Sequence, residues 1–150
     1  MRRGSSIHSR RGRQAGVGLV EVMIAVLVLS IGLLGLAGLQ LRTLRNNQSA
    51  LERGVAVVEI HAIADAMRAD RIGADNDLFN IALTDGAPTG TTFAQTVLRS
   101  WRNNLIASLG SAATGSVNCD GYLCTIVVQW DDTRATGGSA TQTLRTQVQL

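Results

Sequence analysis

The stretch Gly16-Val17-Gly18-Leu19-Val20-Glu21, with the apolar run that follows it, decides the fold of this chain. The twenty positions from Val22 to Leu41 contain no charged residue, and Gln40 is the only strongly polar side chain among them. A helix rises ~1.5 Å per residue, so such a run covers about 30 Å, the thickness of the hydrocarbon core of a bilayer. We therefore predict a membrane-spanning helix over residues 17–41, with one carboxylate near its start.

An arginine-rich leader precedes this helix. Residues 1–16 contain five arginines, no acidic residue and no apolar segment. The whole chain has 14 basic residues, all of them arginine, against 11 acidic ones, so the part after the leader is slightly acidic. The positive-inside rule places the leader in the cytoplasm and the remainder on the outer side of the membrane. Nothing in this charge distribution requires a nucleic-acid-binding surface.

Gly16 is the residue after which we expect the leader to be removed. A secretory signal peptide has its small-residue cleavage site beyond the apolar run. Here the run is followed by Arg42, Thr43, Leu44 and Arg45, which do not form such a site. A cut between Gly16 and Val17 would keep the apolar run on the mature chain and create a new α-amine on Val17.

The carboxylate of Glu21 has two interpretations. In the first, Glu21 lies at the headgroup boundary, where the partial positive charge of a helix N-terminus favours an acid. In the second, it forms an assembly salt bridge with the new ammonium group of a neighbouring subunit inside a bundle of helices. A charged residue within a span costs about 3 kcal/mol on insertion scales, so an opposite charge on the next subunit would set the direction and register of assembly.

Three glycines recur inside the span at Gly32, Gly35 and Gly38. Glycine costs about 1 kcal/mol relative to alanine in a helix interior, whereas small residues let membrane helices approach closely. The three positions are interpreted as a helix-packing face, as a place where the helix can stretch locally, or simply as glycines of the kind that spans often contain.

Beyond the span, residues 42–71 are predicted to continue the same helix as an amphipathic segment that packs on a small domain. The predicted buried stripe consists of Leu44, Gln48, Leu51, Val55, Val58, Ala62 and Ala66, widened by Ile60, Ile63 and Met67. Glu52 and Glu59 lie off this stripe, and we expect water to solvate both.

Residues 72–150 are predicted to form an outer α+β domain. Residues 72–92 and 111–116 have the composition of loops, and 93–109 has helical periodicity that ends at Gly110. Residues 117–130 are rich in β-branched and aromatic side chains around a turn at Asp120-Gly121, and 141–150 alternate as a closing strand. The expected fold is one long helix packed on a small antiparallel sheet.

Cys119 and Cys124 are the only cysteines and flank the predicted turn. In an oxidising compartment outside the membrane this pair is interpreted as a hairpin disulfide. Free thiols and a metal site are the alternatives, although no second Cys or His pair completes a zinc site.

No pattern of catalytic residues is evident, so we expect no enzyme activity, no cofactor, no metal and no small-molecule substrate. His61 is the sole histidine after the leader and is interpreted as a surface or packing residue. Asp131-Asp132, in a polar turn, is the place where a binding function of the outer domain would be sought.

The N-terminal arrangement resembles the class III signal of type IV pilins and pseudopilins. That signal has a basic leader, a glycine at the cut, a hydrophobic mature N-terminus and glutamate as its fifth residue; Gly16, Val17 and Glu21 match the last three features. Residues 29–40, 64–70 and 128–132 are similar, more specifically, to a minor pilin.

The resemblance implies that a prepilin peptidase cuts after Gly16 and methylates the amine of Val17. It also implies a single-pass protein of the bacterial inner membrane, with its C-terminal domain in the periplasm. The subunit would then join other minor and major pilins, prime fibre assembly and take a place at the pilus tip, with a tip adhesin as a further partner. Such fibres serve adhesion, twitching motility and DNA uptake. A pseudopilin of a type II secretion system shares the same N-terminus and is the alternative.

Overall fold

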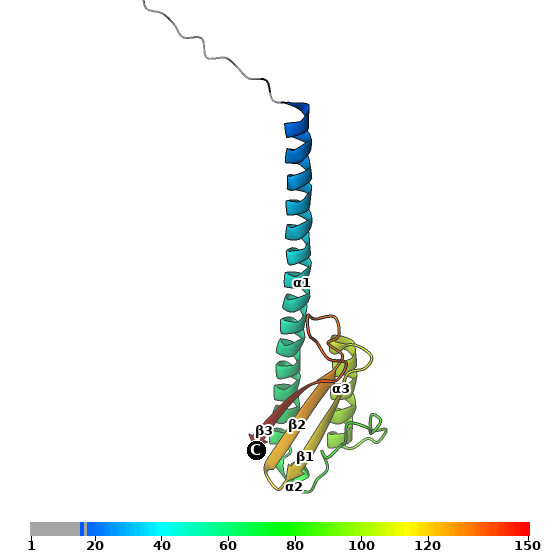
Figure 1. The fold of residues 1–150 in the computed structure, drawn as a ribbon. Helices are drawn as coiled ribbons and strands as arrows, with labels where there is room; N and C mark the ends of the chain where they lie inside the picture. Colours follow the sequence, from blue (N-terminus) through cyan, green and yellow to red (C-terminus); the bar gives the residue numbers. More distant parts are fainter. Residues whose placement is uncertain (1–15, 17) are drawn as a thin grey trace, which may run out of the picture. The chain divides into compact units, whose positions relative to one another are not determined.

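The computed structural model describes Gly16 and residues 18–150; Val17 and residues 1–15, which hold the expected leader and the expected new N-terminus, lie outside the described residues. The elements along the chain are α1 (Leu19–Ala69), α2 (Arg71–Asp75), α3 (Phe93–Leu109), β1 (Thr114–Asp120), β2 (Leu123–Trp130) and β3 (Gln142–Gln149) (Figure 1). The predicted α+β class, a long N-terminal helix and a small antiparallel sheet, is confirmed. The chain divides into two compact units, one ending at Leu39 and the other beginning at Gln40.

The end of α1 is set by Asp70. Its backbone leaves the helical region at φ −130° and ψ 65°, and its side chain accepts a hydrogen bond from the Gly73 amide at 3.0 Å. This N-cap starts α2 at once. The short helix α2 therefore lies where the sequence predicted the beginning of a loop, because one aspartate both ends the long helix and begins the next.

The sheet has the strand order β1-β2-β3, with both pairs antiparallel. Gly121, at φ 59°, makes the predicted turn between β1 and β2, a conformation that glycine adopts without steric cost. β1 begins at Thr114, inside the segment predicted as a loop. Glycine is needed at position 115 because Trp101 and Leu105 of α3 lie where a β-carbon would project.

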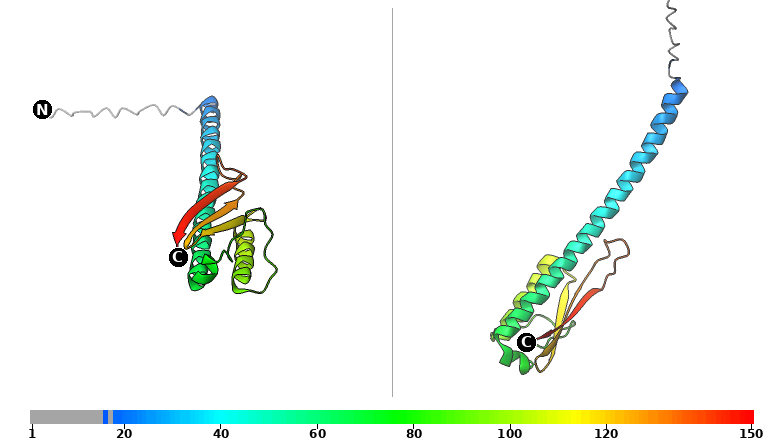
Figure 2. Two further views of the ribbon diagram at one scale, coloured as in Figure 1. Left: turned by 90° about the horizontal axis from the view of Figure 1, so that it is seen from below. Right: turned by 90° about the vertical axis from the view of Figure 1, so that its left-hand side faces the viewer.

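α3 has the bounds that the sequence predicted. Thr92 and Gln95 form a capping box at its start, and Gly110, at φ 101°, ends it. The indole nitrogen of Trp101 donates a hydrogen bond of 3.0 Å to the carbonyl of Glu59, which ties α3 to α1. Figure 2 shows α3 beside the C-terminal part of α1, with both helices on one face of the sheet.

The face that α1 buries differs from the predicted stripe. The buried residues of α1 are Ser49, Glu52, Ala56, Ile60, Ile63, Ala64 and Met67. Leu44, Leu51 and Val58 remain 62–65% exposed on the opposite side of the helix. The helix has two apolar sides, and periodicity by itself does not say which of them the sheet covers. The predicted burial of Ile60, Ile63 and Met67 is confirmed. The predicted burial was wrong for five residues of the stripe, which are exposed: Leu44, Gln48, Leu51, Val58 and Ala62.

Arg102 fixes the segment between α2 and α3. Its guanidinium donates hydrogen bonds to the carbonyl of Ala82 at 2.6 Å and to that of Asp85 at 2.9 Å. The residue is 5% exposed, and burial lowers its pKa, an effect that the nearby charge of Asp85 partly offsets. A buried arginine thus holds the backbone between Ala82 and Asp85 in place through charge-assisted hydrogen bonds.

Candidate functional site

The first turn of α1 places a single carboxylate at the start of the apolar helix. The carbonyl of Gly18 accepts hydrogen bonds from the amides of Glu21 at 3.0 Å and Val22 at 3.2 Å, which begins the helix. Glu21 is the acidic residue of this first turn. The unpaired amides of a helix N-terminus carry partial positive charge, so the backbone supports a carboxylate at this position.

The side chain of Glu21 is exposed, and no hydrogen bond or ion pair joins it to any other residue that the structure describes. Gly16 is exposed as well. Val17, whose new amine is the expected partner in a neighbouring subunit, lies outside the described residues, so the predicted cleavage, methylation and salt bridge remain predictions. Within the described chain, the carboxylate is open to a partner from another molecule.

No described residue covers the apolar surface that follows Glu21. Every residue from Leu19 to Leu39 is exposed, and the large side chains among them are 51–78% exposed. Within residues 18–150, α1 is the one helix long and apolar enough to cross a membrane. A helix that is apolar on all sides and uncovered requires lipid or the apolar surfaces of other subunits around it.

No packing contact with another described residue explains the three glycines of the apolar part of α1. A β-carbon added at Gly32, Gly35 or Gly38 would meet no atom within 4 Å. With 3.6 residues per turn, Glu21, Gly32 and Gly35 lie within about 60° of one another around the axis. One side of the helix therefore carries the carboxylate near its start and two positions without side chains farther along.

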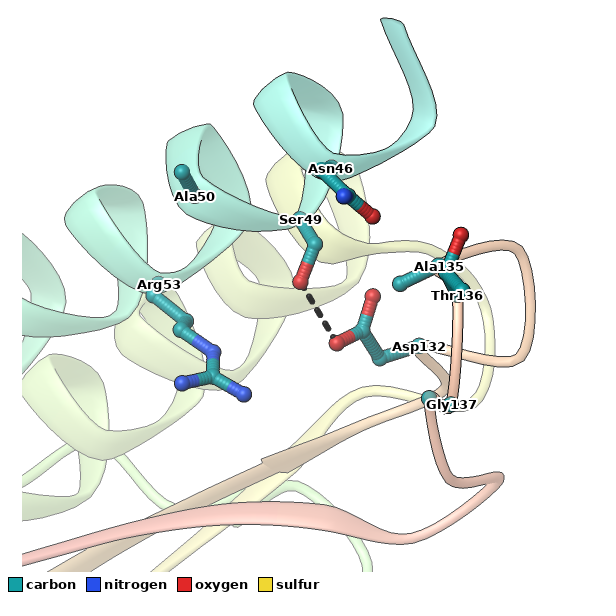
Figure 3. A pocket seen from close by; sticks show the side chains of 9 residues that line it. Asn46, Ser49, Ala50, Arg53, Asp132, Ala135, Thr136 and Gly137 are labelled. Carbon is teal, nitrogen blue, oxygen red and sulfur yellow. Dashed lines mark hydrogen bonds between the residues drawn. The ribbon is translucent and has the colours of Figure 1, made fainter. Parts of the chain in front are cut away.

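A second polar site lies in the C-terminal unit, where the segment between β2 and β3 meets α1 (Figure 3). The hydroxyl of Ser49 donates a hydrogen bond of 2.7 Å to Oδ2 of Asp132. The residue Asp132 is 3% exposed. Backbone hydrogen bonds join Asp132 to Ser139 and to Ala135, so the segment folds back on itself. A shallow pocket opens at this contact, and its lining residues are Asn46, Ser49, Ala50, Arg53, Asp132, Ala135, Thr136, Gly137 and Gly138.

This geometry changes the interpretation of the Asp131-Asp132 turn. Asp132 is buried against α1 and holds the turn in place, so it is not an exposed binding residue. Asp131 is half-buried and accepts a hydrogen bond of 2.9 Å from the amide of Thr133, which holds its pKa below the ordinary value. Both carboxylates stabilise the turn itself.

Glu52 and Glu59 are not solvated as predicted. Glu52 is 5% exposed; its carboxylate accepts a hydrogen bond from Gln48 at 3.1 Å and lies 3.4 Å from the guanidinium of Arg134. Glu59 is half-buried, and burial raises its pKa. The prediction failed for Glu52 because its partner Arg134 comes from a segment 82 residues away in sequence.

Cys119 and Cys124 form a disulfide across the turn between β1 and β2. The two residues are paired directly in the antiparallel ladder, and both are buried. The bond thus closes the end of the sheet. Beyond it, the guanidinium of Arg71 lies 5.1 Å from the ring centre of Tyr122 and donates a hydrogen bond of 2.6 Å to the carbonyl of Leu150.

Among Gly16 and residues 18–150, no three metal-ligating side chains come together. His61 is exposed on α1. Trp130 buries its indole nitrogen without a hydrogen-bond partner. The polar contacts described for the C-terminal unit stabilise its fold. The candidate functional site of the described chain is therefore the start of α1.

Comparison with known proteins found one family model that matches the N-terminal part of the chain. The prokaryotic N-terminal methylation motif matches residues 11–37, which include Gly16, Val17, Glu21, Gly32 and Gly35. No curated protein and no solved structure matches the chain. The motif supports a type IV pilin-like or pseudopilin subunit, and it implies processing by a prepilin peptidase, membrane anchoring and pilin assembly. The fold, a long apolar helix with a small three-stranded sheet, is consistent with that class.

Proposed function

We propose that this protein is a minor pilin that takes part in the priming, assembly or tip formation of type IV pili. The methylation motif supports the broader class, and the likeness of residues 29–40, 64–70 and 128–132 to the minor pilin PilV supports the narrower one. Fibres of this kind would give the protein its place in adhesion, twitching motility and DNA uptake.

The first step is processing at the membrane. Before assembly, the arginine-rich leader stays in the cytoplasm, the helix crosses the inner membrane and the C-terminal domain faces the periplasm. Prepilin peptidase cuts between Gly16 and Val17 and methylates the new amine. The disulfide between Cys119 and Cys124 suits the oxidising periplasm.

One observation carries the second step, which is assembly. Glu21 is an exposed carboxylate at the head of a helix whose side chains are uncovered as far as Leu39. Inside a bundle of such helices, an isolated carboxylate costs about 3 kcal/mol on insertion scales, and the ammonium group of Val17 on a neighbouring subunit removes that cost. Uncut chains have no amine at this position, so only processed subunits are admitted.

The glycines serve the same step. Gly32 and Gly35 share a side of the helix with Glu21, and their lack of side chains lets a neighbouring helix approach closely there. Close approach and the salt bridge then act together, because both require the neighbouring helix on that side. Gly38 lies farther around the helix and widens this packing face.

A second candidate is a pseudopilin of a type II secretion system, since the motif over residues 11–37 is common to both classes. A role as a binding module at a pilus tip is a third candidate, and the exposed pocket residues Asn46, Arg53 and Thr136 are where it would be sought. Detection of the protein in sheared pili separates the first of these functions from the second.

Mass spectrometry of the mature protein tests the processing step. The expected N-terminal peptide begins with methylated Val17, and replacing Gly16 with leucine should leave full-length protein in the inner membrane and none in sheared fibres. A mature chain that begins at Met1, or beyond the span, contradicts the proposal. Normal incorporation of the uncut Gly16→Leu protein into fibres contradicts it as well.

A further inference from the structure

Among the residues that the structure describes, none pairs with the outer edge of β3. The amide of Leu150 donates a hydrogen bond of 2.9 Å to the carbonyl of Tyr122, in line with the β2–β3 register. Hydrogen-bonded and non-hydrogen-bonded pairs alternate in an antiparallel ladder, so the even-numbered residues of β3 direct their amides and carbonyls toward β2. The odd-numbered residues, Thr143, Arg145, Gln147 and Gln149, direct theirs outward. No hydrogen bond from any described residue reaches these outward groups.

The opposite edge of the sheet is covered. Val117 of β1 exchanges two backbone hydrogen bonds with Ile81, at 2.9 and 3.0 Å. The amide of Cys119 donates a hydrogen bond of 2.7 Å to the side-chain oxygen of Asn80. The segment before α3 thus closes one edge, while the other presents a row of outward donors and acceptors.

The β3 edge also has few of the devices that keep sheet edges from pairing. Proteins protect such edges with proline, bulges, short strands, covering loops or charges. β3 is eight residues long, its register with β2 is continuous, and the single proline of the chain is Pro88. Its one charged residue is Arg145.

The chemistry of the edge specifies what fits it. Outward amides and carbonyls at every second residue match the backbone of another extended chain. On the inner face, Leu144 and Val148 are only half-buried against the core, so apolar side chains of an added strand would complete their cover. On the outer face, the guanidinium of Arg145 has no ion-pair partner among the described residues, so an acidic side chain opposite would pair with it.

We propose that the edge of β3 binds an extended segment of a partner protein as a fourth strand of the sheet, with an acidic side chain opposite Arg145 and apolar side chains on the inner face. This inference does not rest on the proposed fibre function. Pairing of β3 with a second copy of itself fits less well, because β3 contains no acidic residue to meet Arg145.

The test uses the full-length protein in detergent micelles and a capped nine-residue peptide as the probe. The peptide alternates threonine and valine and carries glutamate at its central position. Hydrogen exchange of the amides of Thr143, Arg145, Gln147 and Gln149 should slow about tenfold at a peptide concentration ten times its Kd. The amides of Leu144 and Thr146, which already face β2, should change little.

Two altered peptides separate the contribution of the charge pair with Arg145 from that of the backbone hydrogen bonds. A peptide with lysine in place of glutamate should bind several-fold more weakly, and Arg145→Glu should reverse that preference. A peptide whose edge-facing amides are N-methylated should give no protection, because it cannot complete the ladder. Equal binding of the methylated peptide, or no protection by the glutamate peptide, overturns the proposal.

Matched variants test the edge itself. Thr143→Pro and Gln147→Pro each remove an outward amide that has no partner within the described chain, so the disulfide and the circular dichroism should be unchanged while peptide binding is lost. Thr143→Ala and Gln147→Ala keep the amides and should bind normally. Peptide binding that survives both proline substitutions overturns the proposal. Protection of the four amides that rises with protein concentration in the absence of peptide also overturns it, because that result assigns the edge to a second copy of the chain.

Discussion

The hydroxyl of Ser49 and the carboxylate of Asp132 form a buried hydrogen bond of 2.7 Å between residues 83 positions apart. The contact joins α1 to the segment between β2 and β3. A hydrogen bond to a charged group contributes about 1.5–3 kcal/mol, and an unpaired buried carboxylate costs more than an unpaired neutral group.

Ser49→Ala should therefore destabilise the protein by about 2 kcal/mol, because it leaves the carboxylate of Asp132 buried without its donor. Chemical denaturation of the full-length protein in detergent measures this change. Thr136→Ala, at an exposed position in the same pocket, should have almost no effect. Equal effects of the two substitutions would show that the Ser49 contact does not hold the segment.

Replacing both cysteines with alanine should lower the free energy of unfolding by about 2 kcal/mol in the chain-entropy description, since the loop that the disulfide closes is short. The residues pair directly at the end of the β1–β2 ladder, so the sheet should keep its register. The double variant should unfold at the same denaturant concentration with and without reductant, whereas the unsubstituted protein should be weakened by reductant. A reductant effect that persists in the variant would contradict the assignment.

Glu59→Gln should stabilise the protein slightly at neutral pH. Burial raises the pKa of Glu59 above its ordinary value of 4.5, so the folded state holds this proton more tightly than the unfolded state does. Its contribution to stability is consequently present at low pH and is lost as the pH rises through the carboxyl range. In denaturation measured across pH, the free energy of unfolding of the Glu59→Gln variant should equal that of the unsubstituted protein well below pH 4.5 and should exceed it above that pH. Asp65→Asn, at an exposed position, is the control.

Glu21→Ala should leave cleavage intact and weaken assembly. The substitution leaves the ammonium group of Val17 on a neighbouring subunit without its partner, and an unpaired charge within a span costs about 3 kcal/mol, which corresponds to roughly a hundredfold loss in the assembly equilibrium. Immunoblots of sheared fibres and of membranes measure the partition of the protein. Ser30→Ala, in the same helix, should incorporate normally. An unchanged fibre yield for Glu21→Ala would favour the interpretation in which the carboxylate only marks the membrane boundary.

Gly35→Leu should separate the packing role of the glycines from their effect on the helix. A β-carbon at this position meets no atom of the described chain within 4 Å, so membrane insertion and processing should be unaffected. Incorporation into fibres should fall because a neighbouring helix can no longer approach closely. Leu36→Met is a control of similar bulk on a nearby position. Equal incorporation of both variants would show that Gly35 has no packing role.

Local signals accounted for the elements. The bounds of α3 follow from a capping box at Thr92 and a glycine at position 110, and the β1–β2 turn follows from Gly121. These features involve residues three or four positions apart, so the element boundaries can be predicted from the sequence. The short helix α2 was missed because its signal, Asp70 as a cap on Gly73, is embedded in the end of a longer periodic segment.

The sequence by itself determined the start of the apolar helix, the carboxylate near that start, and the order of Gly16, Glu21 and the apolar run, because each depends only on neighbouring residues. Only the tertiary structure decided which side of α1 faces the sheet, that Glu52 and Asp132 are buried, and that β3 keeps an open edge. The physical reason is that burial and pairing depend on residues distant in sequence. Arg134 lies beside Glu52, and Asn80 and Ile81 cover β1 while no described segment covers β3.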